Sequence, residues 1–256
     1  MKIAISGKGG VGKTTLTALL ARLIAKEGKR VLLVDADPNP NLAMALGIRD
    51  TSKLVPIAQM SDLIAERTGA KPGGWGVFFR MNPKVDDLPE KLSIEVDGIR
   101  LMIMGTVTSG GAGCVCPESV MLKALVTHLV LYRDDFLIMD MEAGLEHLGR
   151  ATAAKTDLLI AVTEPSLRSV ETVRRIEKLA GDIGIRRVGV VLNKVRAPDE
   201  VEMVKGSIGE LELLGYLPFD EEILRADLEG RIPYPDLSDV PEGVVRIKDR
   251  ILALAG

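Results

Sequence analysis

The chain has 256 residues, of which 46% are hydrophobic and 3% aromatic, and its 33 basic and 36 acidic side chains give a net charge of -3. This length allows one large domain with an ample core of small and branched aliphatic side chains. No basic excess favours non-specific binding of nucleic acid, and no apolar run reaches the length of a membrane span, so we expect neither as a partner. The chain enters an apolar strand at once, so we also expect no signal peptide and a cytoplasmic protein with reduced thiols.

The amino-terminal segment predicts a phosphate-binding loop between a strand and a helix. The sequence Gly-Lys-Gly-Gly-Val-Gly-Lys-Thr-Thr at 7–15 follows an apolar run and precedes apolar residues at helical spacing. The spacing Gly-x4-Gly-Lys-Thr is that of a P-loop, whose backbone N–H groups cradle a polyphosphate. A glycine-rich turn that binds nothing is the weaker interpretation, because both the spacing and the flanks match. We expect Lys13 to reach the β- and γ-phosphates. The predicted nucleotide-binding residues of this loop are Gly9, Gly10, Val11, Gly12, Lys13, Thr14 and Thr15.

The loop carries a second lysine, Lys8, which gives the heptapeptide Lys-Gly-Gly-Val-Gly-Lys-Thr. This heptapeptide resembles the deviant Walker A motif of MinD, ParA and the nitrogenase iron protein. The resemblance implies that Lys8 crosses a dimer interface to the nucleotide of the partner, so that Lys8 and Lys13 both act in catalysis. A solvated loop lysine without such a role is the alternative.

Two acidic segments follow predicted buried strands. The strand at 30–34 runs into Asp-Ala-Asp-Pro-Asn at 35–39, and the strand at 136–139 runs into Asp-Met-Glu-Ala-Gly at 140–144. Because ligands of open α/β sheets bind at the carboxyl ends of strands, we expect both segments beside the P-loop. Acidic caps of the following helices are the alternative.

These acidic segments supply the predicted hydrolytic machinery. We expect Asp37 to orient the attacking water, and the segment after the second strand to sense the γ-phosphate. The predicted Mg²⁺ ligands are Thr14, Asp35 and Asp140, and the predicted switch residues are Glu142 and Gly144.

Two cysteines, Cys114 and Cys116, lie in a glycine-rich loop just before a predicted helix that starts at Pro117. A position near a helix amino terminus favours the thiolate, which binds soft metals such as Zn²⁺, Ni²⁺ and Cu⁺ or an iron–sulfur cluster. Two thiolates make half of a tetrahedral site, and neither His128 nor His147 is expected to complete it. Two chains meeting face to face would supply four thiolates on a twofold axis. Buried structural cysteines are the alternative.

A nucleobase site is predicted from two later segments. Asn193 and Lys194 leave an apolar strand at 188–192, and Pro218 lies at the end of the last predicted strand. The Asn193 amide can read the edge of a base. The motif that marks guanine specificity is absent, because Arg196 follows Val195, and this favours ATP.

Strands alternate with helices along the chain, and we find no internal repeat and no linker. We therefore predict a single doubly wound α/β domain over residues 1–256, with a mostly parallel sheet and helices on both faces. The polar, turn-rich segment at about 71–98 is expected to be a mobile flap or a partner-facing surface. The terminal helix from about 241 is expected to pack on the core rather than anchor a membrane.

Taken together, the motifs resemble those of the CooC-type ATPases, over essentially the whole chain. They are the heptapeptide at 8–14, Asp-x-Asp-Pro-Asn at 35–39, Cys-x-Cys at 114–116, Asp-Met-Glu-Ala-Gly-Leu-Glu-His-Leu-x-Arg at 140–150, Glu-Pro at 164–165 and Asn-Lys-Val at 193–195. The resemblance implies a homodimer that closes on ATP and Mg²⁺, and that holds one Ni²⁺ or Zn²⁺ through the cysteines of both chains. Hydrolysis to ADP and phosphate would release the metal to a client nickel enzyme, carbon monoxide dehydrogenase or acetyl-CoA synthase.

Two other functions share the P-loop motifs. An electron-transfer ATPase like the nitrogenase iron protein needs two well-separated cysteines per chain, whereas this chain has one tight pair. A positioning ATPase like MinD or ParA would act on a membrane or the nucleoid. The net negative charge disfavours this function, as does a terminal helix that has few lysines and no bulky aromatic residues.

Overall fold

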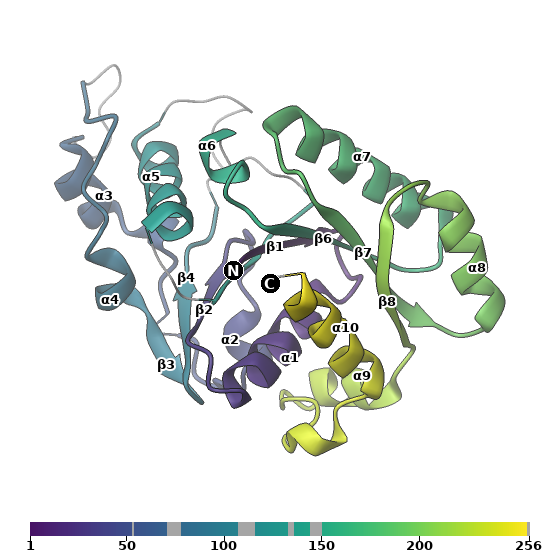
Figure 1. Cartoon of the computed structure of the whole chain (residues 1–256). Helices are drawn as coiled ribbons and strands as arrows, with labels where there is room; N and C mark the ends of the chain where they lie inside the picture. The colour runs from purple at the N-terminus through teal and green to yellow at the C-terminus, as the bar shows by residue number, and fades with distance from the viewer. Residues whose placement is uncertain (53, 71–77, 107–115, 133–135, 144–149, 255–256) are drawn as a thin grey trace.

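The fold is a layered α/β arrangement in which one sheet separates two sets of helices (Figure 1). The computed structural model describes residues 1–52, 54–70, 78–106, 116–132, 136–143 and 150–254. The sheet has eight strands in the order β3-β4-β2-β5-β1-β6-β7-β8, and every neighbouring pair is parallel except β3 and β4. The predicted fold class is therefore confirmed.

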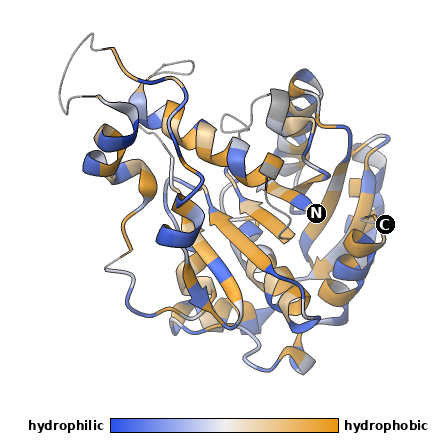
Figure 2. Ribbon diagram, turned by 60° about the vertical axis from the view of Figure 1, so that its left-hand side comes forward, coloured by the Kyte–Doolittle hydropathy of each residue, from blue (hydrophilic) through white to orange (hydrophobic). Residues whose placement is uncertain are grey.

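The strands are short apolar runs, and those in the middle of the sheet are buried on both faces, as expected for parallel strands covered by helices. Figure 2 shows how hydrophobic residues are concentrated along them. The strands are β1 Lys2–Gly7, β2 Val31–Asp35, β3 Ile94–Val96, β4 Ile99–Ile103, β5 Phe136–Asp140, β6 Leu158–Thr163, β7 Val188–Val195 and β8 Glu212–Pro218.

The helices divide between the two faces of the sheet (Figure 1). One face carries α1 Lys13–Lys26, α2 Leu42–Ala45, α9 Glu221–Leu228, the 3-10 turn η2 Leu237–Asp239 and α10 Glu242–Ala253. The other face carries η1 Ile57–Gln59, α3 Ser61–Thr68, α4 Leu88–Leu92, α5 Pro117–Tyr132, α6 Arg150–Ala153, α7 Leu167–Ile183 and α8 Pro198–Ser207.

Strand periodicity explains the two cores. Along β1, Ile3 and Ile5 belong to the cluster under α1 and α10, whereas Ala4 belongs to the cluster under α5 and α7. Successive side chains of a strand point to opposite faces, so each strand contributes to both cores.

The structure also places the segments whose role the sequence left open. Val244, Ile247 and Ile251 of α10 are buried in the core, which confirms the core-packed interpretation. In the described part of the chain, no helix is both long and apolar enough to cross a membrane. Residues 78–98 contain α4 and β3 and bury Leu88 in the core, while residues 71–77 lie outside the described residues.

The strand order brings three carboxyl ends together. β5 lies between β1 and β2, so that Ile5 and Asp35 are both register partners of Asp140. The loop that leaves β1 and the acidic residues that end β2 and β5 therefore meet at one edge of the sheet, where ligands of doubly wound folds bind.

A buried arginine fastens the carboxyl-terminal part of the chain to α1. The Arg22 guanidinium donates to the carbonyl oxygens of Pro233, Tyr234 and Pro235 at 3.4, 2.9 and 2.8 Å. Tyr234 is held at a φ of 52°, which is unfavourable for a residue with a side chain, and its hydroxyl donates to Asp220. This network holds the segment before α10 against α1 and against Asp220, which follows β8.

We expect Arg22→Met to lower the free energy of unfolding by about 2–4 kcal/mol, because three carbonyls, two of them in buried hydrogen bonds, lose a charged donor. Denaturant unfolding measures this change. The matched control is Arg250→Met, which removes an exposed ion pair with Glu212 and should cost at most about 1 kcal/mol. Equal losses in the two variants would contradict the anchoring role.

Candidate functional site

The loop between β1 and α1 presents backbone donors to an open space. Gly10 and Gly12 have φ values of 80° and 93°, in the left-handed region that favours glycine. Gly12 is the amino-terminal cap of α1, and no described side chain caps this helix end by a hydrogen bond. Uncapped N–H groups and the positive end of the helix dipole together make an anion site.

The two lysines of the loop differ in their surroundings. Lys13 is buried, and its Nζ lies 3.4 Å from the carbonyl oxygen of Lys8, so its ammonium folds back over the loop. The Lys8 side chain is exposed. Lys13 is therefore placed to bind a phosphate held by its own loop, while Lys8 points toward solvent, where a second molecule could meet it.

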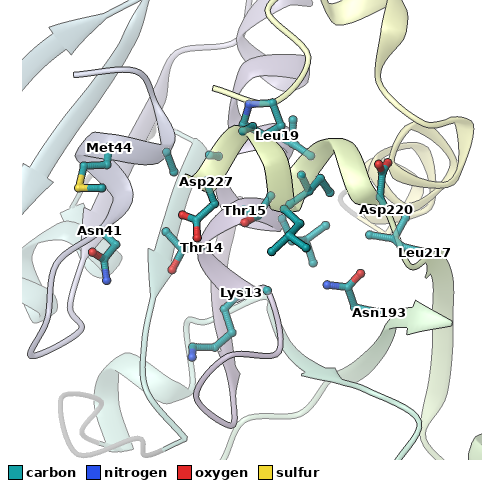
Figure 3. Close-up of a pocket in the computed structure, with 18 of the residues that line it drawn as sticks. Lys13, Thr14, Thr15, Leu19, Asn41, Met44, Asn193, Leu217, Asp220 and Asp227 are labelled. Carbon is teal, nitrogen blue, oxygen red and sulfur yellow. The ribbon is translucent and has the colours of Figure 1, made fainter. Parts of the chain in front are cut away.

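A cavity of about 900 Å³ opens beside this loop, within the size range of cofactor pockets. Figure 3 shows Lys13, Thr14 and Thr15 between two walls. One wall carries Asn41 and Met44 from α2 and its approach, and the other carries Asn193, Leu217 and Asp220. Gly10, Gly12, Lys194 and Pro218 also line the cavity.

Two buried carboxylates lie at the phosphate end of this site. Asp140 is 1% exposed, and its Oδ2 accepts a hydrogen bond of 2.7 Å from the Thr14 hydroxyl. Burial raises the pKa of Asp140 to about 7, although the Thr14 hydrogen bond opposes this shift. Burial also raises the pKa of Asp35 to about 6. In both cases the burial of a negative charge outweighs the hydrogen bonds that the carboxylate accepts.

A divalent cation would compensate these two buried negative charges. The Oδ1 atom of Asp140 is buried and has no hydrogen-bond partner among the described residues. Carboxylate and hydroxyl oxygens are the hard ligands that Mg²⁺ prefers. Asp140 and Thr14 would hold the ion, which would neutralise charge on bound phosphates.

Asp35 makes two local backbone hydrogen bonds in addition to its predicted role beside the Mg²⁺ ion. Its two carboxylate oxygens accept hydrogen bonds from the backbone N–H groups of Asp37, at 3.2 Å, and Leu42, at 2.9 Å. Asp35 therefore shapes the loop that carries the half-buried Asp37, whose Oδ1 accepts from Asn39 N at 2.9 Å. Direct ligation of Mg²⁺ by Asp35, and water orientation by Asp37, stay predictions.

Asn193 and Lys194 lie within β7 and contact the backbone of the P-loop. Asn193 Nδ2 donates to the Val11 carbonyl at 2.8 Å, and Lys194 Nζ donates to the Gly10 carbonyl at 2.5 Å. A Cβ on Gly12 would lie 2.3 Å from Asn193 Nδ2, so glycine is required for this approach. The two side chains thus hold the phosphate loop, while base recognition by Asn193 stays a prediction.

One feature at the base end of the cavity escaped the sequence reasoning. The Arg196 guanidinium lies 3.9 Å from the centre of the Phe219 ring, and Phe219 lines the cavity next to Pro218. A cation on one face of the ring orients it and leaves the ring available for stacking. The signal was the single phenylalanine of the loop after β8.

The switch and cysteine residues are only partly described. Glu142 is exposed and lies two residues beyond the end of β5, whereas Gly144 and Cys114 lie outside the described residues. Cys116 immediately precedes α5, and its Sγ accepts a hydrogen bond of 3.4 Å from Ser119 N. This contact with the first turn of a helix is the environment that favours a thiolate. No group of three or more metal-binding side chains occurs within the described ranges.

The contacts of Asn193 predict how its removal acts. We expect Asn193→Ala to weaken the binding of ATP and the binding of GTP by the same factor. The substitution loosens the loop that binds the phosphates of both nucleotides. Competition binding with ATP, GTP and inorganic triphosphate measures the ratio. A selective loss of ATP affinity would instead show that Asn193 reads the base.

Comparisons with known proteins agree with this geometry. A family model described as the CobQ/CobB/MinD/ParA nucleotide binding domain matches residues 2–234. An uncharacterized ATP-binding protein of Methanocaldococcus jannaschii is 50% identical over 90% of both chains. The carbon monoxide dehydrogenase accessory protein CooC of Rhodospirillum rubrum is 45% identical over 93% of this chain and 90% of its own length.

Solved structures show the same fold. The cell division ATPase MinD of Pyrococcus furiosus has a TM-score of 0.68 at 24% identity, covering 99% of this chain and 100% of that chain. A ParA family ATPase of Chlorobium tepidum has a TM-score of 0.69 at 21% identity, covering 98% of both chains. The chain therefore belongs to the CobQ/CobB/MinD/ParA nucleotide-binding family and is a CooC-type ATPase.

Proposed function

We propose that this ATPase is a metallochaperone that dimerises on ATP and delivers Ni²⁺, or Zn²⁺, to a client nickel enzyme. The observation that carries the proposal is the likeness to CooC, a carbon monoxide dehydrogenase accessory protein, at 45% identity over 93% of this chain. The client would accordingly be carbon monoxide dehydrogenase or the related acetyl-CoA synthase.

The nucleotide half of the proposal assigns a role to each side of the cavity. Lys13 and the amino terminus of α1 bind the β- and γ-phosphates, because Lys13 lies over the loop and the helix end is uncapped. Thr14 and Asp140 hold Mg²⁺, which offsets phosphate charge. Asp37, presented by the loop that Asp35 shapes, orients the water that attacks the γ-phosphate.

The catalytic role of Lys8 requires a second subunit. Its side chain is exposed, whereas Lys13 is buried against the loop, so the two lysines serve different molecules. In a face-to-face dimer, Lys8 would add positive charge to the nucleotide of the partner subunit, where charge develops during phosphoryl transfer.

The metal is the cargo, and the cysteines are its proposed ligands. Cys116 lies at the first turn of α5, where the N–H of Ser119 contacts its sulfur. Cys114 and Cys116 from each of two chains would give four thiolates, a donor set that suits a soft, four-coordinate ion. Closing and opening the dimer would then capture and release the ion.

Size-exclusion chromatography with metal analysis tests the proposal on reduced protein. The protein is compared with ADP and with a non-hydrolysable ATP analogue, each with and without added metal. The set is run once with Ni²⁺ and once with Zn²⁺. We expect dimers with the ATP analogue, and one metal ion per dimer. ATP-dependent dimers that hold no metal would contradict the metallochaperone and indicate a positioning ATPase, and broad visible absorption would indicate an iron–sulfur protein.

Two variants separate the steps. The double variant Cys114→Ser/Cys116→Ser should still bind nucleotide but lose the metal. Lys8→Ala should bind ATP with unchanged affinity and fail to dimerise, whereas Lys29→Ala, an exposed lysine beyond the other end of α1, should dimerise normally. Unchanged metal content without the cysteines, or normal dimers of Lys8→Ala, would contradict the proposal.

A further inference from the structure

A buried serine joins the strand before the P-loop to the segment that follows Asp140. Ser6 is fully buried near the end of β1, and its Oγ donates a hydrogen bond of 2.5 Å to the backbone carbonyl of Glu142. The two residues are separated by 136 positions in the sequence. None of the motifs described above includes Ser6.

The face on which Ser6 lies is apolar. Ser6 follows the alternation of β1 and shares the face of Ala4, and its register partner on β6 is Ala161. A buried hydroxyl without a partner would be costly in such surroundings. The Glu142 carbonyl satisfies it, so the hydroxyl specifies where the chain after β5 must pass.

Ser6 lies on a closely packed part of the sheet. A Cβ on the next residue, Gly7, would lie 2.3 Å from the carbonyl oxygen of Val162, which shows how closely the end of β1 packs against β6. The main-chain ladder continues from Ile3 to Gly7 along this pair. The hydroxyl is therefore presented from a strand that packs closely against its neighbour.

Three consecutive residues after the core of β5 are fastened to β1 or to the P-loop. Asp140 accepts from Thr14 at 2.7 Å, Met141 N donates to the Ile5 carbonyl at 2.9 Å, and the Glu142 carbonyl accepts from Ser6. The Ser6 bond is the last of the three, beyond the end of the strand. It fixes the peptide between residues 142 and 143 and so limits how Glu142 can be oriented. It also restrains the chain two residues after Asp140.

We propose that Ser6 is a positioning residue for ATP hydrolysis, which holds the Asp140–Glu142 segment in register with the P-loop. Nucleotide binding depends on Lys13 and the start of α1, which Ser6 does not touch. Asp140 keeps its own hydrogen bond from Thr14 without Ser6, so the contribution of Ser6 falls on the step that requires Glu142 to be correctly placed. The inference rests on the ATPase activity and on the predicted switch role of Glu142, and not on metal delivery.

The test is Ser6→Ala, assayed without transition metal. We expect kcat to fall about tenfold, the scale of one lost hydrogen bond of about 1.4 kcal/mol, with KM for ATP and Kd for Mg-ADP within about threefold of wild type. Hydrogen exchange at the amide of Met141, which donates to the Ile5 carbonyl, should quicken, because the Ser6 bond that holds the following residue in place is gone. This exchange readout needs no catalysis, so it judges the Ser6 contact even if wild-type protein fails to hydrolyse ATP, a result that would contradict the ATPase assignment.

The matched control is Thr68→Val. Thr68 is also fully buried, and its hydroxyl donates to the Ile64 carbonyl at 2.6 Å within α3, away from the cavity. This variant should lose at least as much thermal stability as Ser6→Ala, because Thr68 Oγ1 also accepts from Ala70 N at 3.2 Å, but it should keep wild-type kcat and wild-type exchange at the Met141 amide. An unchanged kcat in Ser6→Ala, or equal losses of kcat and Mg-ADP affinity, would overturn the positioning role.

Discussion

The hydrogen bond between Thr14 and Asp140 connects the start of α1 to the end of β5, and the geometry of the site depends on it. It is possible only because β5 lies between β1 and β2, which makes Asp140 the register partner of both Ile5 and Asp35. The same arrangement buries two carboxylates at one edge of the sheet. Such burial is unfavourable in the absence of a cation, and it is the reason why a Mg-nucleotide should stabilise the folded state.

The direction of this electrostatic cost follows from the raised pKa values of Asp35 and Asp140, about 6 and about 7. A carboxyl group whose pKa is raised by folding binds a proton more tightly in the native state than in the unfolded state. Without a cation, the two groups therefore lower stability as the pH rises from about 4, the usual aspartate value, to about 7. A bound divalent cation would remove this penalty by favouring the charged forms.

The phosphate loop is held from behind as well as from its own helix. Asn193 and Lys194 of β7 bind its carbonyl groups, so that its N–H groups remain directed toward the ligand. Glu164, at the end of β6, lies 3.8 Å from Lys194 Nζ and adds an ion pair at this junction. Two strands that contribute nothing to the P-loop sequence thus fix its shape.

The sequence was sufficient to predict the features that depend on local spacing. The P-loop, the alternating strands and helices, and the core-facing stripe of α10 all follow from residues a few positions apart. What it could not show depends on which strands become neighbours. The bond from Ser6 to Glu142 and the bond from Asn193 to the Val11 carbonyl join segments whose proximity appears only once the strand order is known. Likewise, Leu88 reads as part of a polar, turn-rich segment, but α4 buries it against the core.

Calorimetric titration of ADP, with Mg²⁺ and with EDTA, tests the Thr14–Asp140 site most directly. Wild-type protein should bind ADP more tightly with Mg²⁺, whereas Asp140→Asn should lose most of that gain, about tenfold or more, and keep its affinity in EDTA. Asp236→Asn, at an exposed cap far from the P-loop, should behave as wild type. A full Mg²⁺-dependent gain in Asp140→Asn would contradict the assignment of Asp140 as a Mg²⁺ ligand, because the cation would then be held by other residues.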